Sequence, residues 1–258
     1  MRGLALEGGG ARGAYHIGVV KAYLEAGYEF DGFVGTSIGA INAAMLAQGD
    51  FDKAMELWEN ISMEQIFYPD EKYIFHLTDL FSTGGNKESL PKIKKAFAEI
   101  IRGKGVNTSK IKTFLDSYID ESKIRSSGKD FGLVTVSLDE LKPYELMLED
   151  IPQGKLVSYI MASASLPGFH PETIDGIRFL DGGFYNSCPA NLLIDRGYSE
   201  VVAVRTNALG VFRKIDGEAN VKIVTPRKSL GNVLSFSKES CVANIGYGYH
   251  DGLCSLKS

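Results

Sequence analysis

The sequence has few cysteines and histidines, and it has no long apolar run. Its three cysteines, Cys188, Cys241 and Cys254, form neither a CxxC pair nor a spacing typical of Cys/His metal ligands. An odd count without such spacing argues against a disulfide framework and favours a reducing compartment. No run approaches the roughly 18 apolar residues that a membrane-spanning helix requires. The first residues are typical of a strand rather than of a signal peptide, so we expect a cytoplasmic protein.

The charge balance argues against nucleic acid as a partner. The formal net charge is −4, and the lysines within 92–95 and 110–112 are typical of solvated helix faces. A hydrophobic content of 44% with 23% charged residues is that of an ordinary globular protein. A chain of 258 residues lies at the upper end of what one domain holds. We therefore predict a single domain over residues 1–258.

Strands and helices are expected to alternate in the first sixty residues. Short apolar runs predict strands at 2–7 and 30–35. Helices are expected over 11–27 and 51–60, and a small-residue helix between them ends at Gly49. Tight glycine turns separate these elements. This order predicts a parallel α/β core.

The middle of the chain has a different character. Residues 61–130 begin with an aromatic-rich piece and continue with two amphipathic helices, expected near 88–102 and 108–120. We interpret this region as a cap or insertion over the core rather than as a second domain. The remaining predicted elements are strands at 131–139, 143–150, 200–206 and 221–226, and a final helix from about Val233.

The pentapeptide GTSIG, residues 35–39, lies between an apolar strand and a small-residue helix. G-x-S-x-G in this setting is typical of a nucleophile elbow, because the strained turn needs glycines and the helix passes close to the strand. The hydroxyl of Ser37 is then presented at a helix N-terminus, where the dipole and free N–H groups favour developing negative charge. The alternative is that Ser37 only caps the helix.

Two partners for this serine are compatible with the sequence. A Ser-His-Asp triad needs a histidine, and the four present are His16, His76, His170 and His250. His250 follows a serine and an aspartate in the chain order of α/β-hydrolases, but those enzymes have several strands before the nucleophile. The other candidate is Asp181, which ends an apolar strand and precedes two glycines. An Asp-Gly pair is also typical of a plain β-turn.

The glycine-rich segment after the first predicted strand has two interpretations as well. G-x-G-x-x-G over 8–13 occurs in dinucleotide sites, which place an acidic residue about 20 positions further on, at the end of the second strand. Here Asp31 stands at the start of that strand, and the strand ends in Gly35, Thr36 and Ser37. The other interpretation is a loop whose N–H groups face a different negatively charged group.

Four blocks together resemble the patatin-like phospholipase family: EGGGARG (7–13), GTSIGA (35–40), ASASLPGFHP (162–171) and DGG (181–183). They occur in that family's order, and the later strands and final helix also suit it. One departure is Glu7, where plant members carry Asp, although bacterial-type members often show Glu. The resemblance implies a three-layer α/β/α fold with a mainly parallel central sheet and a helical, aromatic cap.

The resemblance also implies a Ser-Asp dyad that needs no histidine. Ser37 is expected to be the nucleophile and Asp181 the base that takes its proton. The implied oxyanion loop consists of Gly8, Gly9 and Gly10. The supporting residues are Arg12, Gly13, Gly35, Gly39, Gly182 and Gly183, with Arg12 either steadying the loop or meeting lipid phosphate. No metal or other cofactor is implied.

The expected substrates are acyl esters, namely phospholipids, lysophospholipids or neutral acylglycerols. A transient contact with a membrane surface fits such substrates. Residues 66–81 supply side chains that either line an acyl groove, rest on an interface or pack as plain core. These are Phe67, Tyr68, Tyr73, Ile74, Phe75, Leu77, Leu80 and Phe81. A triad esterase of the α/β-hydrolase type and a dinucleotide-binding protein remain the alternatives.

Overall fold

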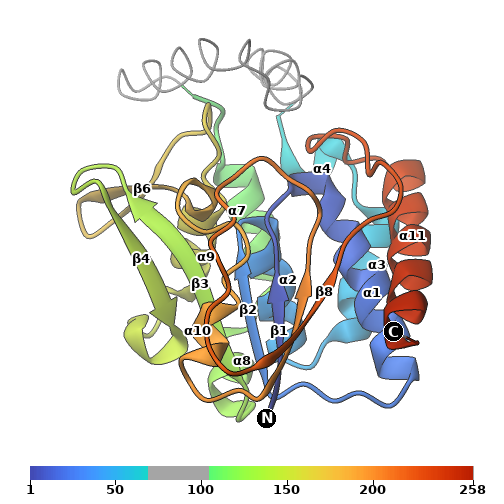
Figure 1. Ribbon diagram of the computed structural model, residues 1–258. Helices are drawn as coiled ribbons and strands as arrows, with labels where there is room; N and C mark the ends of the chain where they lie inside the picture. The colour runs from blue at the N-terminus through green and yellow to red at the C-terminus, as the bar shows by residue number, and fades with distance from the viewer. Residues whose placement is uncertain (69–104, 258) are drawn as a thin grey trace.

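A computed structural model describes residues 1–68 and 105–257, and an eight-stranded sheet runs through its centre (Figure 1). The strands are β1 (Arg2–Leu6), β2 (Gly32–Thr36), β3 (Asp130–Ser137), β4 (Lys142–Met147), β5 (Glu172–Ile174), β6 (Ile177–Asp181), β7 (Glu200–Val204) and β8 (Asn220–Val224). Their order in the sheet is β5-β6-β3-β2-β1-β7-β8, and β4 pairs with β3 outside this path. The pairs from β3 through β2, β1 and β7 to β8 are parallel, whereas β4, β5 and β6 pair antiparallel.

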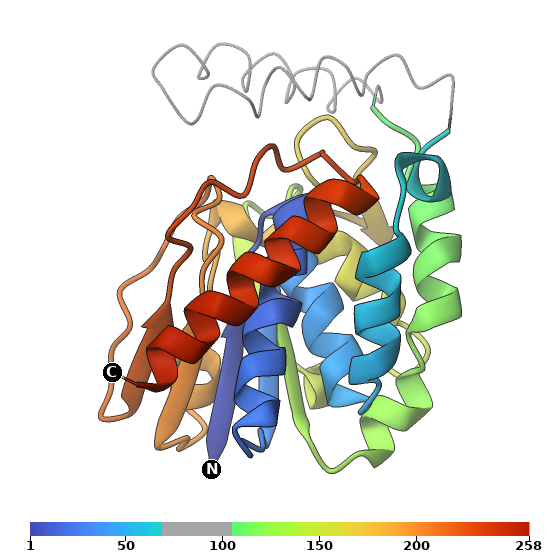
Figure 2. The same cartoon turned by 90° about the vertical axis from the view of Figure 1, so that its right-hand side faces the viewer.

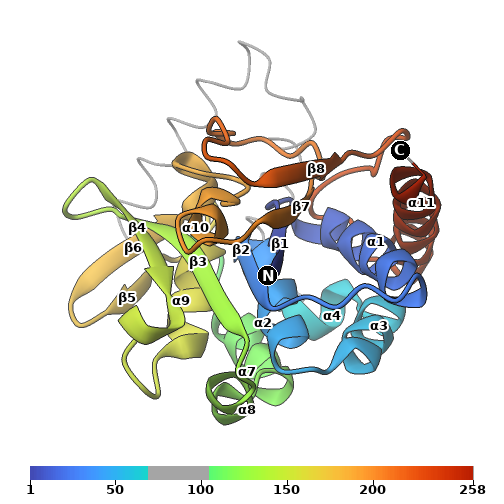
Figure 3. The same cartoon turned by 60° about the horizontal axis from the view of Figure 1, so that its bottom comes forward.

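Helices cover both faces of this sheet, as the sequence predicts. They are α1 (Ala14–Glu25), α2 (Ile38–Ala47), α3 (Phe51–Asn60), α4 (Met63–Ile66), α7 (Ser109–Tyr118), α8 (Glu121–Ser126), α9 (Leu156–Ser163), α10 (Asn191–Ile194) and α11 (Lys238–Leu256). Figure 2 looks onto one face, where α1 lies behind α11 and α3 stands beside α11. Figure 3 shows α10 on the other side of the sheet from α1 and α2. The two helical layers are therefore unequal in size.

Apolar side chains on the central strands point alternately to the two faces of the sheet, so helices must cover both faces. Leu4 and Leu6 of β1 point into the larger core with Phe33 of β2, whereas Ala5 and Val34 belong to the smaller core under α10. Successive side chains of a strand point to opposite faces, so a continuous apolar run buries both. The short runs at 2–7 and 30–35 are therefore central strands.

The described parts of the segment 61–130 belong to the larger core. Phe67, Leu115 and Ile124 are buried among the side chains of α1, α2 and α3. The helix predicted near 108–120 is α7, while the one predicted near 88–102 lies outside the described residues. Within the described ranges no helix is both long and apolar enough to cross a bilayer.

The last helix begins later than predicted. α11 begins at Lys238 rather than near Val233, because the side chain of Ser237 accepts a hydrogen bond from the N–H of Ser240 and caps the helix there. Val233 and Phe236 are buried in the non-helical segment before it. The apolar residues that suggested helix thus pack against the rest of the molecule as a loop.

Candidate active site

The register of β3 brings two distant segments together at the carboxyl edge of the sheet. Val134 of β3 pairs with Thr36, the last residue of β2, and the next residue, Thr135, pairs with Asp181, the last residue of β6. One strand therefore holds the ends of β2 and β6 beside each other. Ser37 follows Thr36 directly, so this register places Ser37 next to Asp181 although 144 positions separate them in sequence.

Ser37 sits on a strained turn between β2 and α2. Its φ of 57° and ψ of −127° lie where residues other than glycine are rare. The following helix passes very close to β1, because a Cβ atom on Gly39 would stand 2.2 Å from the carbonyl oxygen of Leu6. Gly35 likewise faces the backbone of Gly39. This is the geometry of the nucleophile elbow that the pentapeptide predicts.

Two side chains fix the turn from outside. The N–H of Ser37 donates to the Oγ of Ser163 at 2.9 Å, and that hydroxyl donates to the carbonyl of Val134 at 2.6 Å. The hydroxyl of Thr36 donates to the carbonyl of Asn186 at 2.8 Å. Sequence reasoning did not assign Ser163 this position, although it lies in the ASAS run of the third motif block. The elbow is held by hydrogen bonds as well as by glycines.

Asp181 is a buried carboxylate with one oxygen free. Its Oδ1 accepts a hydrogen bond from the N–H of Gly183 at 2.8 Å, while Oδ2 is buried and accepts none from any described residue. Burial raises the pKa of Asp181 to about 6, and the nearby Ser37 hydroxyl and the Gly183 N–H act in the opposite direction. A carboxylate with this pKa and a free oxygen can accept a proton near neutral pH.

The glycine loop follows β1 and continues into the 3₁₀ turn η1 (Gly10–Gly13). It lines the same small cavity as Ser37 and Asp181 and presents N–H groups there that have no acceptor in the described part of the chain. Gly9 and Gly10 have φ values of 140° and 56°, and a Cβ on Gly10 would stand 2.1 Å from the carbonyl oxygen of Val233. Their N–H groups have no acceptor among the described residues, unlike that of Gly8, which donates to Ser187 at 3.0 Å. Only two of the three expected donors are therefore unoccupied.

Buried charge holds this loop in place. Glu7 is fully buried, and its carboxylate accepts hydrogen bonds from the guanidinium of Arg205 at 2.8 Å and from the N–H of Thr206 at 2.6 Å. Arg12 donates to the carbonyl oxygens of Gly231 and Asn207, each at 2.9 Å. These bonds support the expectation that Arg12 steadies the loop. Arg205 carries no motif signal, because it follows β7 almost 200 residues away from Glu7.

The remaining glycines named by the motifs lie where neighbouring atoms leave little room for a side chain. A Cβ on Gly182 would stand 2.0 Å from the carbonyl oxygen of Val134, and one on Gly13 would stand 2.6 Å from the side chain of Ile38. Gly183 supplies the N–H that binds Asp181. Of these three glycines, Gly183 lines the cleft.

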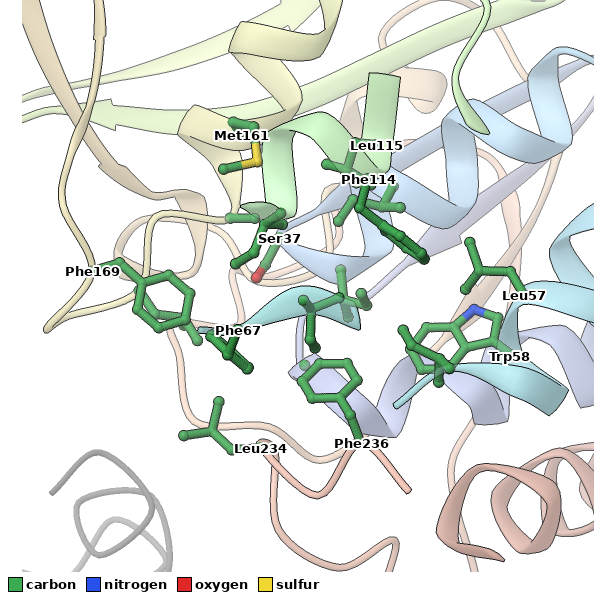
Figure 4. A pocket seen from close by; sticks show the side chains of 18 residues that line it. Ser37, Leu57, Trp58, Phe67, Phe114, Leu115, Met161, Phe169, Leu234 and Phe236 are labelled. Atoms are coloured by element: carbon green, nitrogen blue, oxygen red, sulfur yellow. The ribbon is translucent and has the colours of Figure 1, made fainter. Parts of the chain in front are cut away.

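Two cavities meet at Ser37. The first is a cleft of about 30 Å³ lined by the glycine loop, Ser37 and Asp181, with Ser187 and Leu209 at its side. The second is an apolar pocket of about 80 Å³, room for several water-sized groups. Its labelled walls in Figure 4 are Ser37, Leu57, Trp58, Phe67, Phe114, Leu115, Met161, Phe169, Leu234 and Phe236. Ser37 thus has a polar environment on one side and an apolar one on the other.

Of the expected aromatic residues, Phe67 lines this pocket and Tyr68 is exposed. The stretch from Tyr73 to Phe81 lies outside the described residues.

The histidines do not complete a triad within the described ranges. His16 is fully buried on α1 beside Asn42, and burial lowers its pKa to about 3. His250 contacts Asp251 and Cys254 on α11. The backbone N–H of His170 donates to the carbonyl oxygen of Val106, and His76 lies outside the described residues. No described histidine forms a hydrogen bond with Ser37 or Asp181.

The dinucleotide interpretation fails on geometry. Asp31 precedes β2 and accepts a hydrogen bond from the N–H of Arg2, at the amino end of β1. The glycine loop follows the carboxyl end of β1, so the length of the strand separates the two. A ribose-binding acid must instead stand at the carboxyl end of the second strand.

A parallel α/β sheet with a serine on a strand-to-helix elbow defines a protein of the α/β class with a hydrolase-type nucleophile turn. The chain belongs to the patatin-like phospholipase family, whose sequence model matches residues 4–194. The neuropathy target esterase sws of Drosophila melanogaster is 29% identical over 225 residues, covering 78% of this chain and 12% of that protein. Human patatin-like phospholipase domain-containing protein 6 is 29% identical over 210 residues, covering 78% and 13%.

Among solved structures, VipD from Legionella pneumophila has a similar fold. Its TM-score is 0.57 at 16% sequence identity, and the match covers 99% of this chain and 66% of that one. The chain spans only about an eighth of the length of the two sequence relatives above. These similarities establish the family and the fold.

Proposed function

We propose that this chain is a serine hydrolase that cleaves acyl esters of lipids, with Ser37 as nucleophile and Asp181 as base. One observation carries the proposal: Ser37 stands between a buried carboxylate with a free oxygen and an apolar pocket. Family membership and relatives named as esterase and phospholipase support the same class of reaction. Phospholipids, lysophospholipids and neutral acylglycerols all fit, because each carries an acyl ester.

In the proposed reaction Asp181 Oδ2 takes the proton of Ser37 as Ser37 Oγ attacks the ester carbonyl carbon. The carbonyl oxygen becomes an oxyanion, which the free N–H groups of Gly9 and Gly10 stabilise. When the tetrahedral intermediate collapses, the C–O bond to the alcohol breaks and Asp181 returns the proton to that alcohol. A water molecule then attacks the acyl-enzyme and gives a proton to Asp181. When this second intermediate collapses, the bond between the acyl carbon and Ser37 Oγ breaks, Asp181 returns the proton to Ser37 Oγ, and the fatty acid is released.

The apolar pocket supplies the preference for acyl chains. Its lining is almost entirely aliphatic and aromatic, and Gly10, Ser37 and Leu166 belong to both the pocket and the cleft. An acyl chain in the pocket therefore holds its carbonyl beside Ser37 and the glycine loop. Each buried methylene contributes about 0.8 kcal/mol to binding. The pocket, rather than the cleft, therefore determines which acyl-chain lengths are preferred.

Turnover of a soluble chromogenic ester tests the proposal directly. Ser37→Ala should reduce kcat/KM to background while circular dichroism stays that of wild type, because no other serine among residues 1–68 and 105–257 stands on such an elbow. Ser117→Ala, on the exposed face of α7, is the matched control and should keep wild-type activity. Activity of Ser37→Ala within a few-fold of the control would contradict the proposal.

A further inference from the structure

Three exposed apolar side chains lie beside the mouth of the cleft. Phe184 is 39% exposed, Leu209 44% and Val211 49%, whereas most large apolar side chains in the described part of the chain are buried. Phe184 ends the 3₁₀ turn η3 (Gly182–Phe184) that follows Asp181, while Leu209 and Val211 lie in the connection from β7 to β8. Two segments distant in sequence thus contribute to one apolar surface.

Backbone hydrogen bonds join these two segments. The N–H of Val211 donates to the carbonyl of Gly183 at 2.8 Å, and the N–H of Ser187 donates to the carbonyl of Val211 at 2.7 Å. Leu209 and Gly183 also line the cleft itself. The exposed surface is therefore continuous with the cleft and is tied to the backbone that positions Asp181.

A cation and an aromatic ring border this surface. The guanidinium of Arg213 lies over the ring of Tyr185, 4.3 Å from its centroid, and Arg213 is exposed. Apolar and aromatic side chains beside an arginine are the composition that proteins use at the boundary between lipid head groups and acyl chains. The positive charge of Arg213 is also complementary to lipid phosphate. The chain as a whole has a net charge of −4, so its overall charge does not supply this attraction.

We propose that Phe184, Leu209, Val211 and Arg213 form a docking surface that sets the mouth of the cleft on a lipid–water interface. The inference rests on the proposed lipid hydrolase function, since a substrate with long acyl chains resides in such an interface. Docking beside the cleft leaves the acyl ester only a short path from the interface to Ser37. The apolar side chains enter the head-group boundary, and Arg213 meets phosphate.

Vesicle binding tests this surface without turnover. Flotation with vesicles of phosphatidylcholine and a minor fraction of phosphatidylglycerol is measured on the Ser37→Ala protein, so that no lipid is hydrolysed. Adding Phe184→Ser and Val211→Ser should weaken partition at least tenfold, because two apolar side chains no longer enter the interface. Unchanged melting temperature shows that the variant folds.

A matched control comes from the opposite end of the molecule. Leu24 and Leu253 are 38% and 37% exposed, and Leu24 lies near Glu29 and Phe30, which precede the amino end of β2. Leu24→Ser with Leu253→Ser removes a similar amount of exposed apolar surface and should change partition less than about twofold. Equal binding by all three proteins, or equal loss in both double variants, would overturn the docking surface.

A second variant and a second readout separate this inference from the proposed function. Arg213→Glu should weaken binding to the anionic vesicles more than to pure phosphatidylcholine vesicles, and an equal effect on both would remove Arg213 from the surface. In the active enzyme, Phe184→Ser with Val211→Ser should lower the ratio of vesicle-phospholipid to soluble-ester turnover at least tenfold. An unchanged ratio would contradict docking. If the wild-type protein showed no turnover at all, the proposed hydrolase function would be wrong, and the flotation measurement alone would decide whether the surface docks on lipid.

Discussion

The cleft and the apolar pocket share Ser37 but are built in different ways. The polar groups that the cleft places around Ser37 are backbone N–H groups and one carboxylate, which lie at the ends of β1 and β6. The pocket consists of side chains from α3, α7, α9 and the segment before α11. A polar site made from backbone tolerates almost no substitution, whereas a wall of apolar side chains can be reshaped. We therefore expect cleft variants to stop the reaction and pocket variants to change its substrate.

The largest effect among the loop glycines is expected at Gly10. Gly10→Ala puts a Cβ 2.1 Å from the carbonyl of Val233 and forces alanine into a φ of 56°, so the loop must move. Loss of one oxyanion donor costs roughly 10²–10³ in kcat. The measurement is kcat on a soluble ester, in protein with wild-type circular dichroism.

Gly49→Ala is the control for backbone strain alone. Gly49 has a φ of 82°, and a Cβ there would meet nothing within 4 Å. We expect it to lower the melting temperature and to leave kcat near wild type. If Gly10→Ala were as active as Gly49→Ala, the glycine loop would have no part in catalysis.

The pocket should determine chain-length preference. Leu57 lines it from α3, so Leu57→Phe takes space that two or three methylenes of a bound acyl chain would use. At about 0.8 kcal/mol per methylene, the ratio of kcat/KM for a dodecanoyl ester to that for a butyryl ester should fall about 10- to 100-fold. Assays of both esters on one preparation measure it, and a parallel loss on both would assign Leu57 to stability instead.

The pH dependence should report Asp181. Only the ionised carboxylate can take the proton of Ser37, and burial raises its pKa to about 6. The value of kcat/KM should therefore be constant above neutrality and fall about tenfold per pH unit well below pH 6. A profile on a soluble ester checks this, and activity that stays level down to pH 4.5 would exclude Asp181 as the base.

The same shift has a smaller effect on stability. The folded-state pKa of Asp181 lies above the unfolded value of 3.8, so the protonated form is favoured by folding and the stabilisation is lost as pH rises from about 4 through about 6. The loss is on the order of 3 kcal/mol for a shift of about two pH units. Urea unfolding at pH 4 and pH 7 should show a smaller difference for Asp181→Asn than for wild type.

The sequence predicts more of the cleft than of the pocket. The elbow and the loop glycines are contiguous motifs, so Ser37 and the glycine loop are visible in sequence. The strands near 2–7 and 30–35 were visible because central parallel strands are continuous apolar runs. The contacts of Ser163 and Arg205 were not. The packing of α9 against β3 places Ser163 against Ser37, and the pairing of β7 with β1 brings Arg205 to Glu7.

The pocket was beyond prediction for a related reason. Leu57, Phe114 and Phe236 come from separate parts of the chain. In the sequence, each of them is indistinguishable from an ordinary core residue of its own helix or loop. The final helix was placed too early because Val233 and Phe236 look helical but close over the cleft and the pocket. Periodicity reports that a residue is buried and not which cavity it faces.

The most direct test of the account is the value of kcat/KM for Asp181→Asn on one soluble ester, beside His170→Ala and His250→Ala. An amide of the same shape keeps an oxygen for the Gly183 N–H but cannot act as a base, so we predict a loss of at least 10³-fold in folded protein. Both histidine variants should stay within about threefold of wild type. Activity of Asp181→Asn within tenfold of wild type, or a histidine variant as inactive as Ser37→Ala, would contradict the Ser37–Asp181 dyad.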